Sequence, residues 1–322
     1  MKNLKFLLIA LLIFGLWNCQ QKNKLEVDVS GIPAQVKIDR FDKAFFGQPA
    51  SKLPELKKKY PYILPPNSPD SIWIKKMNDT LFLKLKKQVD SLFPDLKKYK
   101  PAIADLYKHI KYYHPDFRDP KIITLYSDWN FLNRAFYADS LMFLTLDTYL
   151  GKDNPVYTGG VPMYIRQNLI PERIPVELAR AVAQSKVKPP ENKAFLYRMI
   201  NEGKKMYLID AYVPDLPDTL KIGYTAEKYK WAQENEAKVW EYFVTKKLLY
   251  SSANGLENRF LNIAPYSKFY SEIDMETPGQ IGVYTGWQIV RSFMQNNDVS
   301  LQKMIRMPEE EIFKKSKFKP RR

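Results

Sequence analysis

Twelve uncharged and almost entirely apolar residues, 6–17, lie just before the only cysteine of the chain, Cys19. Lys2 and Lys5 precede this apolar segment. A twelve-residue helix rises about 18 Å, which is too short for a hydrocarbon core of about 30 Å, so the segment is typical of a signal peptide. A single thiol excludes a disulfide within the chain, so the rest of the protein must be held together by its apolar core.

The position of Cys19 resembles the lipobox of bacterial lipoproteins. There the thiol takes up a diacylglyceryl group, and cleavage before it frees an amine that is acylated in turn, for example by palmitate. The pattern predicts a signal peptide over residues 1–18, lipidation of Cys19 and a polar tether over residues 19–24. Two or three acyl chains anchor stably, at about 0.8 kcal/mol per buried methylene. The alternative is an uncleaved anchor or a secreted protein with a chance cysteine.

Charge and tether composition predict where the protein acts. The 51 basic residues exceed the 35 acidic ones by 16, and cleavage would remove Lys2 and Lys5, leaving an excess of 14. This excess favours contact with anionic headgroups. Trp17 and Asn18, where small residues are usual, resemble the looser signals of Bacteroidetes lipoproteins. Surface-exported lipoproteins of that phylum resemble one another in acidic residues after the cysteine, which are missing here, so we expect a membrane-anchored protein facing the periplasm.

Hydrophobic residues make up 45 % of the chain and aromatic residues 14 %, which is enough for a sizeable core. Their spacing predicts an α+β fold that is mostly helical, with a small mixed or antiparallel sheet, in one globular domain over residues 25–322. Strand patterns occur at residues 25–30, 36–41, 122–126, 131–137 and 141–146. Helices are predicted at residues 42–46, 53–60, 80–93, 101–113, 176–185, 191–202, 206–211, 226–250 and 282–296, and from residue 308 onward.

Several of these helices have predicted ends. Asp79 or Thr80 is suited to cap the start of the helix at residues 80–93. Thr225 is suited to cap the start of the helix at residues 226–250. Gly203 is suited to the position just after the helix at residues 191–202.

The sequence carries few signals of catalysis. It lacks a P-loop and a Gly-x-Ser-x-Gly nucleophile motif. The only histidines, His109 and His114, lie five residues apart, about 140° around a helix, so they are poor partners for one metal ion. Asp116 and Asp119 keep a surface metal site open as an alternative. We expect no metal, no cofactor and, because the lysine runs are scattered, no nucleic acid partner.

Acidic side chains on the predicted helix at residues 226–250 are a second candidate for catalysis. Glu234 and Glu241 are seven residues apart and would share a helix face, with Glu236 nearby. Paired carboxylates are suited to acid–base chemistry, but a solvated face opposed by Lys238 is the simpler interpretation.

Several segments, in this order along the chain, resemble the GldB family of gliding-motility lipoproteins of Bacteroidetes. The resemblance implies a periplasm-facing lipoprotein that is required for gliding and works with the motility machinery and its linked secretion system. It supplies no biochemical activity. The matching segments are residues 37–42, 149–153, 171–175, 222–225 and 231–236, and Gly282-Val-Tyr-Thr-Gly-Trp-Gln-Ile-Val-Arg291.

That family is in turn distantly similar to predicted zinc peptidases with a His-Glu-x-x-His helix and a later Glu-Gly. The similarity places Glu177 at the general base, and Val176 and Arg180 where the histidine ligands belong. Valine cannot ligate, and a permanent cation repels Zn²⁺. It implies a degenerate zincin-like scaffold, a pseudo-peptidase without its metal. Glu177, Arg180 and Glu202 would line a relic cleft for peptide or glycan, unless Glu177 and Arg180 belong to an ordinary exposed helix face.

Three functions follow from these observations. The first is a non-enzymatic, lipid-anchored component of gliding motility that acts through protein contacts. The second is a hydrolase of peptide or cell-wall material with an unrecognised site. The third is a substrate-binding lipoprotein for uptake. We expect the first.

Overall fold

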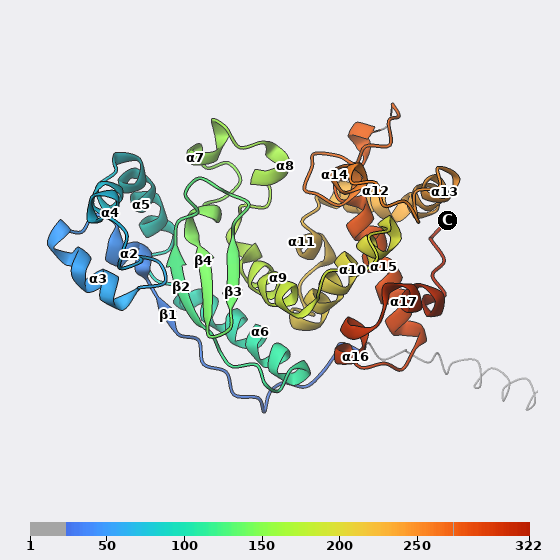
Figure 1. Ribbon diagram of the computed structural model, residues 1–322, viewed down its shortest axis with the longest axis horizontal. Helices are drawn as coiled ribbons and strands as arrows, with labels where there is room; N and C mark the ends of the chain where they lie inside the picture. Colours follow the sequence, from blue (N-terminus) through green and yellow to red (C-terminus); the bar gives the residue numbers. More distant parts are fainter. Residues whose placement is uncertain (1–23, 273) are drawn as a thin grey trace, which may run out of the picture.

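The computed structural model describes residues 24–272 and 274–322. The predicted signal peptide and Cys19 lie outside the described residues. Figure 1 shows an elongated molecule with a group of short helices at one end, a small sheet in the middle and a helical lobe at the other end. The buried apolar side chains form one continuous core that extends through all three parts. Within the described part of the chain, no helix has the length and apolarity needed to cross a bilayer.

The sheet has four strands in the order β1-β2-β4-β3. β1 and β2 are parallel, as are β2 and β4, whereas β3 is antiparallel to β4. The predicted α+β class with a small mixed sheet is therefore confirmed. The strands are β1 (Ile38–Asp39), β2 (Lys121–Leu125), β3 (Ala135–Ala138) and β4 (Leu141–Thr145).

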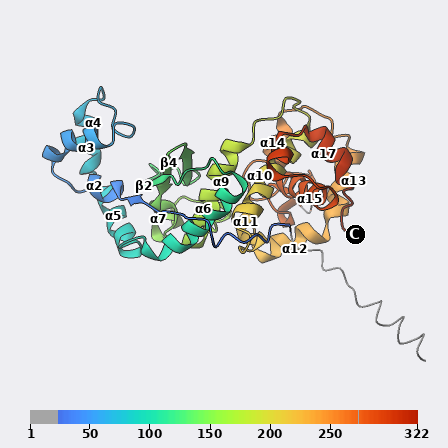
Figure 2. The ribbon, with the colours of Figure 1, turned by 90° about the horizontal axis from the view of Figure 1, so that it is seen from below.

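The alternation at residues 25–30 predicted a strand, and this prediction is wrong. Residues 24–37 instead run as an irregular strap from the helical lobe to β1, across α6 (Lys100–Tyr113), as Figures 1 and 2 show. Lys24 Nζ donates to the carbonyl oxygens of Met294 and Asn297, and Lys111 Nζ donates to that of Pro33. Hydrogen bonds from lysine side chains to backbone carbonyl groups thus replace the ladder that a strand would have formed.

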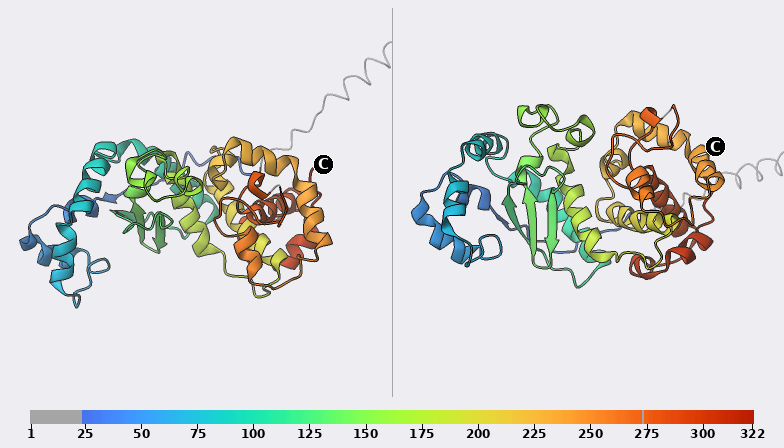
Figure 3. Two further views of the ribbon diagram at one scale, coloured as in Figure 1. Left: turned by 90° about the horizontal axis from the view of Figure 1, so that it is seen from above. Right: turned by 45° about the horizontal axis from the view of Figure 1, so that its top comes forward.

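The helices predicted before residue 114 lie within one residue of their expected bounds, whereas α4 (Asp70–Met77) was not predicted from the sequence. Asp79 caps α5 by accepting from the backbone N–H groups of Leu81 and Phe82. The other helices before residue 190 either form the group at one end of the molecule or lie beside the sheet (Figures 1 and 3). They are α2 (Phe41–Phe45), α3 (Leu53–Lys59), α4 (Asp70–Met77), α5 (Thr80–Leu92), α7 (Pro155–Thr158), α8 (Met163–Arg166) and α9 (Ile174–Lys186).

The C-terminal lobe is helical and is built around two crossing helices, α10 and α15. Gly203 was expected to follow a helix end, but it lies in the middle of α10. A Cβ atom on Gly203 would lie 2.2 Å from the carbonyl oxygen of Gly286 in α15. Glycine here allows α10 and α15 to approach each other closely, and it does not end a helix. The helices are α10 (Phe195–Tyr212), α11 (Asp218–Ile222), α12 (Ala226–Glu234), α13 (Glu236–Thr245), α14 (Gly255–Phe260), α15 (Ile281–Asn296), α16 (Leu301–Arg306) and α17 (Glu309–Ser316).

The single helix expected at residues 226–250 is two helices, α12 and α13, that meet at Asn235. Thr225 caps the first as expected, because its side chain accepts from the Lys228 N–H. Asn235 leaves the helical conformation, and its side chain donates to the Trp231 carbonyl, which ends α12. Glu234 and Glu241 therefore do not share one continuous helix face.

Candidate functional site

A cleft of about 520 Å³ lies between the sheet region and the C-terminal lobe, and we call it the interlobe cleft. The three residues singled out from the sequence, Glu177, Arg180 and Glu202, all line it. α9 supplies the first two and α10 the third. Its other walls come from α8, from the turn after α11, and from loop residues 263–265 and 278–280.

Glu177 lies at the centre of a group of arginines. Its Oε1 accepts hydrogen bonds from Arg134 Nη1 at 2.9 Å and from Arg173 Nη2 and Nε at 2.6 and 3.0 Å. Its Oε2 lies 3.7 Å from Arg180 Nε. Glu177 is only 6 % exposed, so it is not part of an ordinary exposed helix face. One acid is thus surrounded by three permanent cations.

This surrounding determines the charge state of Glu177. Burial by itself raises the pKa of a carboxyl group, but the charges of Arg173, Arg134 and Arg180 outweigh burial and hold the pKa of Glu177 well below its usual range. A carboxylate stabilised in this way has little tendency to take up a proton at neutral pH. It is therefore a poor general base.

Arg180 and Glu202 have looser surroundings than Glu177. Arg180 is 27 % exposed, and its Nη2 donates to the Lys221 carbonyl at 2.8 Å. Glu202 accepts from Lys205 Nζ at 2.6 Å at the edge of the cleft. Both side chains therefore reach solvent from the cleft wall.

Sequence reasoning missed three of the cleft's charged residues, Arg134, Arg173 and Lys228. Arg173 lies four residues before Glu177, a spacing that places both on one helix face, so this pair was readable in principle. Arg134 comes from the loop before β3, forty-three residues away from Glu177, and only the fold brings it in. The mouth of the cleft carries three apolar side chains that are 45 to 51 % exposed, Leu132, Met163 and Ile263.

The back of the cleft depends on a glycine. Gly223 has a φ of +85°, and a Cβ atom there would lie 2.8 Å from Asn168 Oδ1 and 2.9 Å from Arg173 Nη1. Asn168 Nδ2 donates to the Gly223 carbonyl at 3.1 Å, which joins the turn to the opposite wall. Glycine allows both the left-handed conformation and the close approach of the arginine.

The other residues considered from the sequence lie elsewhere. His109 Nδ1 is 3.0 Å from the Asp105 carbonyl oxygen, and His114 Nε2 is 2.6 Å from the Tyr212 hydroxyl. Asp119 pairs with Lys111 at 2.7 Å. In residues 24–272 and 274–322, no group of three or more His, Cys, Asp or Glu side chains is placed to hold a metal ion.

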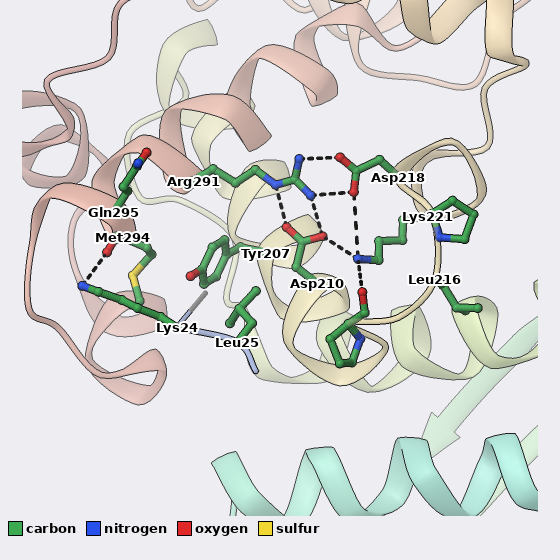
Figure 4. A pocket seen from close by; sticks show the side chains of 12 residues that line it. Lys24, Leu25, Tyr207, Asp210, Leu216, Asp218, Lys221, Arg291, Met294 and Gln295 are labelled. Carbon is green, nitrogen blue, oxygen red and sulfur yellow. Dashed lines mark hydrogen bonds and ion pairs between the residues drawn. The ribbon is translucent and has the colours of Figure 1, made fainter. Parts of the chain in front are cut away.

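A second cavity, of about 490 Å³, lies beside α10, α11 and α15 and is bordered by Lys24 and Leu25 of the strap. Figure 4 shows its polar side, where two acids meet two cations. Arg291 donates to Asp210 at 2.7 and 2.8 Å and to Asp218 at 2.6 and 2.8 Å. Lys221 Nζ lies 3.2 Å from Asp210.

This second cluster is neutral and fully paired. The Arg291 guanidinium lies 3.7 Å from the centre of the Trp287 ring, and Trp287 Nε1 donates to Asp210 at 2.7 Å. Its bonds join three helices of the lobe, so it stabilises the fold. The interlobe cleft, with its uncompensated positive charge, is the stronger candidate for binding.

Comparison with protein families gives one match. The family model described as gliding motility protein GldB matches residues 22–320, nearly the whole chain. No curated protein and no solved structure matches the chain.

Proposed function

Because the chain belongs to the GldB family of gliding motility lipoproteins, we propose that it is a non-enzymatic binding component of the motility machinery. It is anchored to the cell membrane through lipid on Cys19 and faces the periplasm. Its interlobe cleft holds a segment of a partner protein from the motility machinery or the linked secretion system.

The charge state of Glu177 carries this proposal. A hydrolase of the zincin type would use this acid as its general base, with a pKa near the working pH. Three arginines keep the acid ionised and engaged instead. The positions of the two histidine ligands hold Val176, which is fully buried, and Arg180, whose charge disfavours a bound cation.

The strap supports the membrane placement. Lys24 is bound to the end of α15, five residues after Cys19. Five extended residues span at most about 18 Å, so the C-terminal lobe would lie close to the bilayer. α8, which lines the cleft, lies on the opposite side of the molecule from the strap (Figure 1). The cleft is thereby left open to partners.

Replacing Glu177 by aspartate separates binding from hydrolysis. Glu177→Asp keeps the negative charge among the arginines but withdraws the carboxylate by one methylene. Misplacing a catalytic group by about 1 Å can cost 10²-fold in rate. We expect the variant to restore colony spreading in a strain that lacks the protein. Loss of spreading at a normal protein level, together with peptide hydrolysis that is measurable in the wild type and absent in the variant, would favour the hydrolase.

Two further measurements bear on the alternatives. Metal analysis of the purified protein should find no stoichiometric zinc, and one bound equivalent would contradict the proposal. Deletion should abolish spreading without changing growth on single nutrients. A defect confined to one nutrient would favour an uptake function.

A further inference from the structure

We infer that the interlobe cleft takes the free carboxylate at the end of a peptide whose last residue is apolar. This inference names the ligand class of the proposed binding function and rests on it. Three features of the cleft support it: the charges of the lining residues, their remaining hydrogen-bonding capacity and the apolar side chains at the cleft mouth.

The lining residues have a positive excess. Four of them are cations and two are acids, so the formal charge is +2; the cations are Arg134, Arg173, Arg180 and Lys228, and the acids Glu177 and Glu202. The acid at the centre offsets one arginine, and the acid at the edge is already paired with Lys205. A cleft walled by protein holds such an excess at lower dielectric than bulk water, so an anion is attracted into it.

Not every cation is available to a ligand. Lys228 Nζ donates to three carbonyl oxygens, at 2.8, 2.8 and 2.9 Å, and so fixes the loop that forms one wall. Arg173 is buried and uses Nε, Nη1 and Nη2 on Glu177 and on the Leu220 carbonyl. These two cations stabilise the walls of the cleft and are not available to bind the ligand.

Arg134 and Arg180 have capacity left. Arg134 uses Nη1 on Glu177 and Nε on the Phe131 carbonyl, and its Nη2 has no hydrogen-bond partner within residues 24–272 and 274–322. Arg180 Nε lies 3.7 Å from Glu177, beyond hydrogen-bond distance, and among the described residues Nη1 donates only to the Met206 sulfur, at 3.8 Å. A carboxylate has two oxygens that accept such N–H groups, and arginine favours this planar partner.

The side chains at the mouth of the cleft favour an apolar group next to the ligand's carboxylate. The exposed side chains of Leu132, Met163 and Ile263 offer an apolar rim above the cationic floor. A ligand that matches both has an apolar side chain next to its charged group, as the last residue of a peptide does. The volume of about 520 Å³ is in the range of pockets for small ligands, which suits a chain end and not a folded surface.

Calorimetric titration of the full chain in detergent tests this with a matched pair of probes. The probes are acetyl-Ala-Ala-Leu with a free carboxylate and the same peptide as its C-terminal amide. We expect the acid to bind at least tenfold more tightly than the amide at low salt. Equal affinities, or no binding of the acid, would overturn the inference. So would tighter binding of inorganic phosphate than of the acid.

Three variants locate the effect. Arg180→Gln should bring the ratio of acid to amide affinity close to one. Leu132→Glu changes an exposed residue, so folding is not at risk, and its new charge should also lower that ratio. Arg118→Gln removes an exposed cation outside the cleft and should leave the ratio unchanged. An unchanged ratio in both cleft variants would contradict the inference.

The two proposals can fail separately. If acid and amide bind equally while Glu177→Asp restores spreading, the ligand class is wrong and the non-enzymatic function stands. If the wild type hydrolyses peptide and Glu177→Asp abolishes both that hydrolysis and spreading at a normal protein level, the proposed function fails whatever the peptide affinities show.

Discussion

Gly203 of α10 and Gly286 of α15 lie against each other's helix backbone at the centre of the C-terminal lobe. A Cβ atom on Gly286 would lie 1.8 Å from the Met199 carbonyl oxygen of α10. The atom that it would meet belongs to the backbone, which cannot move aside as a flexible side chain can. The crossing also sets the position of Trp287 and Arg291, which bind Asp210 from the next turns of α15.

Gly286→Ala should therefore destabilise the protein severely. Overpacking usually costs about 1–3 kcal/mol, and here two main chains must separate, so we expect a loss of about 3 kcal/mol or more in the free energy of unfolding. Urea unfolding followed by circular dichroism measures it. Gly255→Ala in α14 is the matched control, because nothing lies within 4 Å of the added Cβ. A loss of equal size in both variants would show that the crossing is not the cause.

Gly203 shows which features of this fold could not be predicted from the sequence alone. A helical pattern that stops before glycine predicts a helix end, and local rules supply no reason to continue through it. The backbone of α15, about eighty residues later, makes glycine necessary inside α10. Elements whose ends are set locally were predicted well, such as α5 with its Asp79 cap and α9.

The charged residues of the interlobe cleft likewise divide into those that the sequence could identify and those that it could not. Glu177, Arg180 and Glu202 came from a resemblance, and the fold places them in one cleft. Arg173 could have been predicted as a partner of Glu177, because it lies four residues before it. Arg134 was not, because no local signal connects a loop before a strand with a helix forty-three residues later.

Glu177→Ala should destabilise the fold by about 3–5 kcal/mol, because it leaves the buried Arg134 and Arg173 without their shared acid. Glu202→Ala removes a half-exposed ion pair with Lys205 and should cost no more than about 1 kcal/mol. Urea unfolding at neutral pH measures the loss of unfolding free energy in both variants. Similar losses in the two variants would mean that Glu177 does not hold the arginines.

Asp147 should make stability fall as pH rises. It is fully buried and accepts from the Ser127 N–H and hydroxyl at 2.8 and 2.6 Å, and burial raises its pKa to about 7. The folded state keeps the proton between about pH 4 and 7, where the unfolded chain releases it. The resulting contribution is complete below pH 4 and lost above pH 7, on the order of 4 kcal/mol.

Asp147→Asn tests this dependence. The amide replaces a neutral carboxyl group of the same shape, so the variant should match the wild type near pH 4.5 and exceed it in stability at pH 8. Unfolding in urea at the two pH values gives the comparison. A variant that is less stable than wild type at pH 8 would show that the hydrogen bonds from Ser127 stabilise the ionised carboxylate more than burial destabilises it.

Cys19→Ala should leave the protein without fatty acid. Cys19 is the only thiol in the chain, so no other residue can form the thioether on which anchoring depends. Cells grown with labelled palmitate should show label in the wild type and none in the variant. Lys24→Ala, which removes the first bond of the strap to α15, should keep the label. Equal labelling of Cys19→Ala and wild type would contradict the proposed anchor and, with it, the placement of the C-terminal lobe beside the bilayer.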